Sequence, residues 1–196
     1  MNTWDPTRAY DVVVIGGGPA GATAADDLAR AGRSVLLLDR AGRIKPCGGA
    51  IPPRLIKDFQ IPDHLLVARA RSARMVSPSD VKVDIPIENG FVGMVDREFF
   101  DEWLRERAVS HGAVRRTGTF ERIEDTNDGM VVVHFRGRTD DGPREGLAAS
   151  VRARCVIGAD GARSDAASDV ATGNVADAVA CSDADADAGS DADADT

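Results

Sequence analysis

The chain has 196 residues, of which 24 are Lys or Arg and 32 are Asp or Glu, so its formal net charge is −8. This length fits one ordinary domain or part of a larger protein, and the acidic balance argues against non-specific nucleic-acid binding. No apolar run approaches the length of a membrane-spanning helix, and residues 1–10 lack the apolar core of a secretory signal. The cysteines Cys47, Cys155 and Cys181 are odd in number and widely spaced, which favours a cytoplasmic protein without a disulfide framework.

The first forty residues carry the pattern of a dinucleotide-binding unit. The apolar run 11–15 predicts a buried strand of a parallel sheet, and it leads into Gly-Gly-Gly-Pro-Ala-Gly at 16–21. An Ala-rich helix is predicted from about 19 to 31, and a second apolar strand over 34–38 ends at Asp39. This order of strand, glycine loop, helix, strand and acid predicts a Rossmann-like α/β fold.

Each polar or glycine position of this unit has a physical role in the prediction. Gly16 permits a tight turn, Gly18 lets a pyrophosphate approach the backbone, and Gly21 lets helix and strand pack closely. The helix N-terminus offers N–H groups and a partial positive charge to phosphates. Asp39 can accept hydrogen bonds from adenosine ribose hydroxyls, and the adjacent Arg40 is a further cofactor-binding candidate. The unit alone leaves open whether the dinucleotide is FAD or a nicotinamide.

The middle of the chain predicts antiparallel strands inserted into this fold. Alternating apolar residues predict a half-buried strand at 81–87, and 91–95 predicts another. The runs 119–124 and 130–136 flank Thr-Asn-Asp-Gly at 126–129, a strong hairpin signal. A polar loop is expected over 137–146.

A helix is predicted after the strand 91–95. Asp96 can cap it, and its apolar residues recur at helical spacing and are expected to face the core: Phe99, Phe100, Trp103, Leu104 and Ala108. Arg97 lies in the first turn, where a cation opposes the helix dipole unless it has another partner. The alternative for Arg97 is a solvated side chain at a helix start.

A second cofactor signal follows a predicted strand over 151–157. The sequence there continues as Gly-Ala-Asp-Gly-Ala-Arg-Ser at 158–164. It resembles the G-A-D-G-x-x-S segment of FAD-dependent hydroxylases and reductases of the glutathione-reductase-like superfamily. The resemblance implies that Asp160, with Gly161 beside it, contacts the ribityl and pyrophosphate region of FAD. Taken by itself, the segment could also be a simple Asp-Gly turn.

Two further motifs narrow the resemblance to one family. Lys-Pro-Cys-Gly-Gly-Ala at 45–50 and Gly-Met-Val-Asp-Arg at 93–97 resemble the FAD-dependent geranylgeranyl reductases of the chlorophyll and bacteriochlorophyll branch. The resemblance runs from about residue 10 to 164. It implies FAD as cofactor, NADPH as electron donor, and an isoprenoid substrate whose geranylgeranyl chain is saturated to phytyl, either as the free diphosphate or on the pigment. It also implies peripheral contact with the photosynthetic membrane.

The same resemblance assigns residues to the flavin. It implies that Arg97 lies against the cofactor, and that Cys47 lies at the isoalloxazine face with Gly48 and Gly49, which makes Cys47 the catalytic candidate. The glycines let backbone approach a planar ring, and the neighbouring cation Lys45 would lower the pKa of the thiol. The alternative for Cys47 is a small residue that fills a tight loop. The three histidines, His64, His111 and His134, show no metal-ligand spacing, so no metal site is predicted.

The charge of −8 is concentrated at one end of the chain. Residues 166–196 hold eight Asp and no Lys, Arg or Glu, so residues 1–165 carry 24 basic and 24 acidic side chains. The repeated Ala-Asp sequence cannot bury enough apolar surface to offset its ordering entropy. We predict that 1–165 is the N-terminal part of an FAD-binding domain with a β insertion, and that 166–196 is a disordered Ala/Asp-rich tail.

The resembled family is longer than this chain, with most of its substrate pocket downstream of the G-A-D-G segment. We therefore predict an α/β, Rossmann-like FAD-binding domain of the glutathione-reductase-like superfamily, with inserted antiparallel strands. We also predict that a frameshift or truncation ends the family sequence before the complete substrate domain. Two alternatives to the reductase stay open. In the first, the chain is an inactive FAD-binding fragment; in the second, it belongs to a related FAD-dependent hydroxylase.

Overall fold

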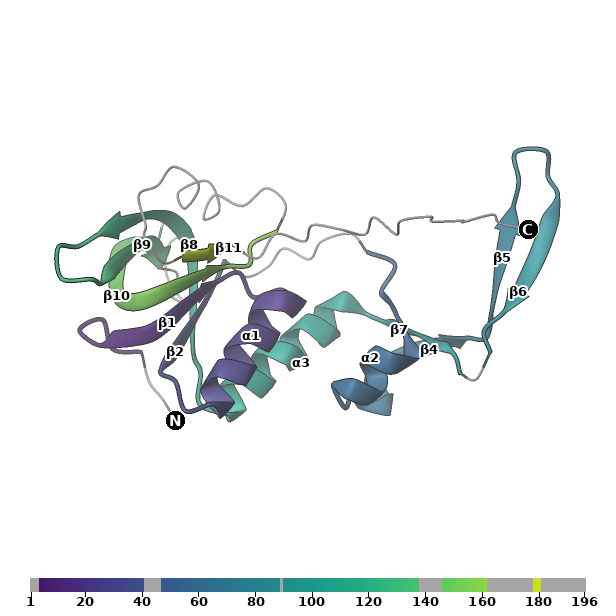
Figure 1. Ribbon diagram of the computed structural model, residues 1–196, viewed down its shortest axis with the longest axis horizontal. Coiled ribbons are helices and arrows are strands. Elements are labelled where there is room, and N and C mark those ends of the chain that lie inside the picture. Colours follow the sequence, from purple (N-terminus) through teal and green to yellow (C-terminus); the bar gives the residue numbers. More distant parts are fainter. Residues whose placement is uncertain (1–3, 41–46, 89, 138–145, 162–177, 181–196) are drawn as a thin grey trace, which may run out of the picture. The chain divides into compact units, whose positions relative to one another are not determined.

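The computed structural model describes residues 4–40, 47–88, 90–137, 146–161 and 178–180 (Figure 1). The chain divides into two compact units, one formed by 1–41 with 107–196 and the other by 42–106. The predicted boundary at 165 lies in 162–177, outside the described residues. The expected polar loop lies outside them as well, over 138–145.

The first unit contains the predicted dinucleotide-binding pattern. Strand β1 (Ala9–Ile15) is followed by helix α1 (Pro19–Arg30) and strand β2 (Val35–Asp39), which pairs in parallel with β1. Strand β10 (Leu147–Gly158) pairs in parallel with the other edge of β1. The order β2-β1-β10, with α1 on one face of the sheet, confirms the Rossmann-like prediction (Figure 1).

Helix α1 ends where glycine allows the chain to turn. Gly32 has φ +78°, and its N–H donates to the carbonyl oxygen of Ala29 at 2.9 Å. The N–H of Arg33 donates to the carbonyl oxygen of Leu28 at 3.0 Å, which completes a Schellman motif. This stop directs the chain back into β2.

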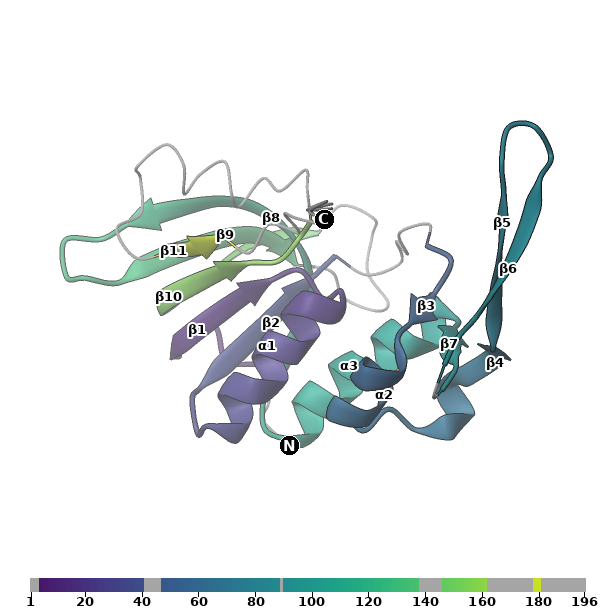
Figure 2. The same ribbon diagram turned by 45° about the vertical axis from the view of Figure 1, so that its right-hand side comes forward.

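A second layer is formed by an antiparallel meander. Strand β8 (Val114–Asp125) pairs with β2 in parallel through Val114–Thr117 and then with β9 (Val131–Gly137) in antiparallel fashion. Strand β10 pairs first with β9 and then with β1. Because β8 and β10 each take part in both layers, the five strands close on themselves in the order β1-β2-β8-β9-β10, and the long strands curve in Figure 2.

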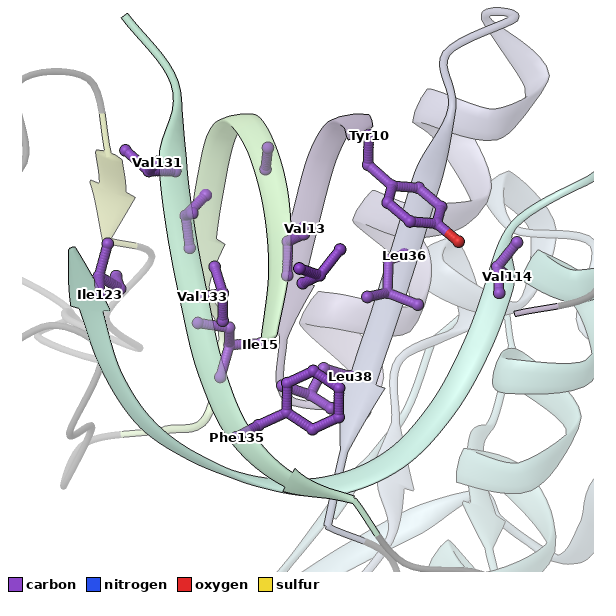
Figure 3. Packing of buried hydrophobic residues seen from close by; sticks show 13 residues of the cluster. Tyr10, Val13, Ile15, Leu36, Leu38, Val114, Ile123, Val131, Val133 and Phe135 are labelled. Atoms are coloured by element: carbon purple, nitrogen blue, oxygen red, sulfur yellow. The ribbon is translucent and has the colours of Figure 1, made fainter. Parts of the chain in front are cut away.

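The core of the first unit lies between these two layers, as Figure 3 shows. Strand alternation sends Val13, Ile15, Leu36 and Leu38 to the face that the meander covers, where they pack with Phe135 and other meander residues. All five side chains are almost completely buried. Burial of each such side chain stabilises the folded state by about 1.5–3 kcal/mol, because apolar surface is removed from water.

The second unit is built from short elements. Strands β3 (Ala50–Ile51), β7 (Val92–Val95) and β4 (Leu66–Ala70) form an antiparallel sheet in the order β3-β7-β4. Helix α2 (Pro53–Asp58) and a 3-10 turn (Asp63–Leu65) lie between β3 and β4 in the sequence. Helix α3 (Arg97–Ser110) follows β7 and continues into the first unit. None of the helices in the described ranges is long and apolar enough to span a membrane.

Strands β5 (Ser72–Val76) and β6 (Lys82–Pro86) form a two-stranded sheet of their own (Figure 2). The pairs Ala73↔Ile85 and Met75↔Val83 place apolar side chains on one face. The strand predicted at 81–87 is present as β6, but the prediction that it is half-buried is wrong, because Val83 is 55% and Ile85 48% exposed. The alternation is present, but no element within the described residues covers its apolar face.

Most of the apolar stripe predicted for the helix after 91–95 is confirmed in α3. Phe100, Leu104 and Ala108 recur every four residues and are buried, and Trp103 is half-buried. Phe99 is the correction, since it is 67% exposed. It lies about 100° around the helix from Phe100 and therefore falls outside the stripe.

One strand lies within the segment predicted as disordered. Strand β11 (Ala178–Ala180) pairs in parallel with β10 from Val156 to Gly158. Because the pairing of β9 with β10 ends at Ala153, the backbone of β10 is available beyond that point. These three residues differ from the predicted disorder, and 181–196 lies outside the described residues.

Candidate cofactor-binding residues and the surroundings of Cys47

In the first unit, three predicted segments meet at the carboxyl edge of the parallel sheet. The register places Ile15 beside both Leu38 and Gly158, so the chain leaves β1, β2 and β10 at the same level. The N–H of Gly16 donates to the carbonyl oxygen of Leu38 at 2.8 Å, and that of Ala159 to the carbonyl oxygen of Ile15 at 2.7 Å. The glycine loop, Asp39 and Asp160 are therefore close neighbours at a topological position where α/β sheets bind ligands.

Two of the predicted glycines have no room for a side chain. Gly16 has φ +108°, and a Cβ there would lie 2.4 Å from the carbonyl oxygen of Ala159. A Cβ on Gly21 would lie 1.9 Å from the carbonyl oxygen of Gly16. The tight turn and the close packing of helix on strand thus both require glycine at these positions.

Gly18 differs from these two glycines because its side-chain position is open. It is the N-cap residue of α1, with φ −72° and ψ −177°, and a Cβ there would meet nothing within 4 Å. Pro19 occupies the first helical position, and the N–H of Ala22 donates to the carbonyl oxygen of Gly18 at 2.9 Å. The backbone at the positive end of a 12-residue helix is therefore accessible on the Gly18 side.

Gly17 was not among the cofactor-binding residues predicted from the sequence. Its N–H donates to Oδ1 of Asp39 at 3.1 Å, and a Cβ there would lie 2.8 Å from Cβ and Cγ of Asp39. Gly17 therefore holds the half-buried Asp39 carboxylate in place at the end of β2. The third consecutive glycine at 16–18 is the signal that could have identified it.

The remaining candidates of the first unit lie beside these segments. Arg40 directly follows β2 and is exposed. Asp160 is half-buried, and its backbone nitrogen would lie 2.7 Å from a Cβ on Gly16. Gly161 is buried with φ +97°, a conformation that favours glycine in the turn after β10.

In the second unit, Cys47 lies in a glycine loop held against β7. The N–H of Gly49 donates to Sγ of Cys47 at 3.4 Å. Gly49 has φ +69°, a Cβ there would lie 2.0 Å from the carbonyl oxygen of Val95, and the N–H of Val95 donates to the carbonyl oxygen of Gly49 at 2.9 Å. Gly48 has open space at its side-chain position. The loop thus presents an exposed thiol on a fixed backbone.

Arg97 and Asp101 of α3 form a bidentate ion pair. Nε of Arg97 donates to Oδ1 of Asp101 at 2.8 Å, and Nη2 donates to Oδ2 at 2.9 Å. Only 17% of the Arg97 side chain and 8% of the Asp101 side chain are exposed. The predicted cap is also present, because Oδ1 of Asp96 accepts the N–H of Glu98 at 2.9 Å.

Within this ion pair, Arg97 is the residue that interacts with the Cys47 thiol. The hydrogen bond from Gly49, and after it a hydrogen bond from the Arg97 side chain, hold the pKa of Cys47 below its usual value. The hydrogen bonds to Asp101 raise the pKa of Arg97. Lys45, the cation that the sequence suggests for this role, lies outside the described residues. The structure brings Cys47 together with Arg97, which lies 50 residues further along the chain.

Comparisons with known proteins agree with this fold and these motifs. The profile of the pyridine nucleotide-disulphide oxidoreductases matches residues 10–91. The chain is 63% identical to the geranylgeranyl diphosphate reductase of Rhodobacter capsulatus, covering 82% of this chain and 40% of that protein. It is 37% identical to the chloroplastic geranylgeranyl diphosphate reductase of Arabidopsis thaliana, covering 88% of this chain and 38% of that protein. The chain therefore spans about 40% of the length of these relatives.

A solved structure shows the same relationship. The geranylgeranyl bacteriochlorophyll reductase-like protein of Thermoplasma acidophilum matches with a TM-score of 0.68 and 27% identity, over 79% of this chain and 40% of that one. The fold is the Rossmann-like FAD-binding domain of the glutathione-reductase-like flavoproteins, with inserted antiparallel strands. Within that class, the chain belongs to the geranylgeranyl reductase family and corresponds to its N-terminal part.

Proposed function

We propose that this chain is the FAD-binding part of an enzyme that saturates the isolated double bonds of a geranylgeranyl chain with NADPH as reductant. The substrate is geranylgeranyl diphosphate or the geranylgeranyl group of a chlorophyll or bacteriochlorophyll. The observation that supports the proposal is the convergence of Gly18, Asp39 and Asp160 at the carboxyl edge of the sheet, in a chain 63% identical to a geranylgeranyl diphosphate reductase. A cytoplasmic location with peripheral contact at the photosynthetic membrane belongs to the same proposal.

The residues of the first unit have the donors and acceptors that FAD needs. The open backbone at Gly18 and the N-terminus of α1 suit a pyrophosphate, and the Asp39 carboxylate suits the adenosine ribose hydroxyls. Asp160 is proposed to bind the ribityl and pyrophosphate region. Arg40, Gly48, Gly49 and Arg97 remain proposed cofactor contacts on the resemblance, and Cys47 remains the catalytic candidate at the flavin. Bound FAD supplies the hydride chemistry that no side chain can perform.

FAD binding by the purified chain is the first test. A Gly18→Ala substitution adds a methyl group where the protein has open space, so we expect the fold to be retained. If the pyrophosphate lies against this backbone, the same methyl group weakens FAD binding by at least about tenfold, which is about 1.4 kcal/mol. Quenching of flavin fluorescence on titration measures the affinity, and thermal unfolding measures the fold. Undiminished FAD binding by this variant would refute the assignment of Gly18.

The role of Asp39 is tested with a matched aspartate. Asp39→Asn keeps an oxygen that can accept the Gly17 N–H but replaces the second carboxylate oxygen with a donor, so FAD binding should weaken by about tenfold. Asp11→Asn is the control, because Asp11 binds Ser34 at the start of β1, the opposite end of the strand from the glycine loop. FAD affinity should not change in the control. Equal losses in both variants would indicate a general effect on the sheet.

Two further assays separate the reductase from its alternatives. NADPH-dependent bleaching of the flavin band, followed by conversion of geranylgeranyl diphosphate to phytyl products, supports the reductase. Reduction of bound FAD only in the presence of an aromatic substrate would favour the related hydroxylase. A chain that binds FAD but is reduced under neither condition would be the inactive FAD-binding fragment.

A further inference from the structure

We propose that Asp101 is a positioning residue for Cys47: through two hydrogen bonds it holds the Arg97 guanidinium in a fixed orientation beside the thiol, and so makes Cys47 more reactive. All three residues lie in the second unit. The inference therefore goes beyond the proposed function and does not require that FAD binds.

The ion pair between Asp101 and Arg97 has a fixed geometry. Asp101 engages two nitrogens of one guanidinium, Nε and Nη2, at 2.8 and 2.9 Å. Two parallel hydrogen bonds fix the plane of an arginine fork, whereas a single bond would leave it free to rotate. The two residues are four positions apart on α3, so the helix itself sets their separation.

The ion pair and the thiol differ in burial. The Asp101 carboxylate and most of Arg97 are removed from water, whereas Cys47 is exposed. A buried charge that loses its partner is strongly unfavourable, so the pair resists separation. The outcome is a rigid buried pair whose cation hydrogen-bonds a thiol that solvent and small electrophiles can reach.

Asp101 has two opposing effects on the pKa of Cys47. Its negative charge disfavours the thiolate and raises the pKa of Cys47, but the hydrogen bond from Arg97 lowers that pKa by more. Arg97 and Asp101, both on α3, are the charged groups that act on Cys47 within the described residues, and the Gly49 N–H is the other donor. Removal of Asp101 therefore gives opposite results according to which effect dominates.

The test is the pH dependence of Cys47 alkylation in the Asp101→Asn variant. Iodoacetamide reacts with the thiolate, and trypsin releases Cys47 in the peptide 44–54, whose alkylation mass spectrometry can follow over time. If Asp101 positions Arg97, the apparent pKa of Cys47 rises and its alkylation at neutral pH slows by about three- to tenfold. If Asp101 acts only through its charge, the pKa falls and alkylation accelerates. Faster or unchanged alkylation overturns the proposal.

Arg97→Lys provides a second and independent variant. Lysine keeps the positive charge but lacks the planar fork, so it cannot bind both oxygens of Asp101 and Cys47 in one fixed geometry. We expect the same slower alkylation as in Asp101→Asn. Wild-type reactivity in a folded Arg97→Lys protein would show that charge alone is sufficient and would overturn the positioning role. This variant decides the question if Asp101→Asn does not fold.

Matched controls come from the same helix and the same protein. Glu102→Gln alters a second ion pair of α3, in which Nη2 of Arg105 lies 2.9 Å from Oε2 of Glu102, and should leave Cys47 alkylation unchanged. Cys155, in the tryptic peptide 155–163, lies in β10 and reports within each sample on general changes in thiol exposure. Because every measurement is made without FAD, a failure of FAD binding would refute the proposed function and leave this result intact.

Discussion

The two units handle the same kind of sequence pattern differently. In the first unit, the alternating apolar residues Val133 and Phe135 of β9 lie between two layers, and neither has any exposed surface. In the second unit, Val83 and Ile85 alternate just as regularly but are about half exposed. The difference teaches that alternation specifies an apolar face, whereas a core also requires a second layer to cover it.

Buried carboxylates show a parallel contrast between the units. Asp26 and Asp101 are the buried charged residues of the described chain. Asp26 of α1 binds Nε of Arg107 at 3.1 Å and Nδ1 of His111 at 2.5 Å, so it links two segments of the first unit. Asp101 binds an arginine that reaches an exposed thiol. Asp26 therefore serves packing within the first unit, whereas we propose that Asp101 positions Arg97 beside the Cys47 thiol.

The largest expected effect concerns the core of the first unit. Phe135→Ala should lower the free energy of unfolding by about 3–5 kcal/mol, because it removes a fully buried ring that also packs edge-on against Trp4. Ile85→Ala in the second unit should change it by less than about 0.5 kcal/mol. Urea denaturation followed by circular dichroism measures both. Comparable losses would mean that the apolar face of β6 is covered in solution, and the contrast between the units would fail.

A smaller loss in the free energy of unfolding is expected when a methyl group is added where helix α1 packs closely on the glycine loop. Gly21→Ala places a methyl group 1.9 Å from the Gly16 carbonyl oxygen, and we expect a net loss of about 1–3 kcal/mol. The free-energy cost of displacing the backbone is expected to exceed the gain of about 1 kcal/mol in helix propensity. Gly48→Ala in the second unit has open space and should be neutral within about 0.5 kcal/mol. Thermal unfolding of the two variants provides the comparison, and a neutral Gly21→Ala would contradict the packing described for the glycine loop.

The parallel unit could be predicted because its signals are local. The run 11–15, the glycines at 16–21 and the acid at Asp39 lie within one short stretch, and strands buried on both faces form continuous apolar runs. The hairpin at 126–129 was equally local, with Gly129 at φ +73°. The structure confirms these elements because their geometry depends on neighbours in sequence.

Features that depend on distant residues could not be predicted in the same way. The dual pairing of β8 and β10 closes the first unit, but neither strand carries a sequence signal for a change of partner. Cys47 and Arg97 were each selected as candidates, yet their hydrogen bond joins positions 50 residues apart, and Asp101 looked like an ordinary helix residue. Side-chain geometry, rather than residue type, reveals that cluster.

The smallest expected effect concerns the exposed sheet of the second unit. Nε and Nη2 of Arg74 bind the Asp84 carboxylate at 2.6 and 2.8 Å, and these hydrogen bonds hold the pKa of Asp84 below its ordinary value of 3.8. A lowered carboxyl pKa contributes stability above the unfolded-state pKa, and this contribution is lost as the pH falls through the folded-state pKa. Arg74→Gln should therefore return the pKa of Asp84 towards 3.8, while stability at neutral pH changes little because the pair is exposed. Carboxyl NMR titration measures this, with Asp128 of the first unit, whose pKa is lowered mainly by Thr126, as an unaffected control. An Asp84 pKa that is already ordinary in the wild-type protein would mean that β5 and β6 do not keep this register in solution, and the second unit would then be less ordered than the first even in its backbone pairing.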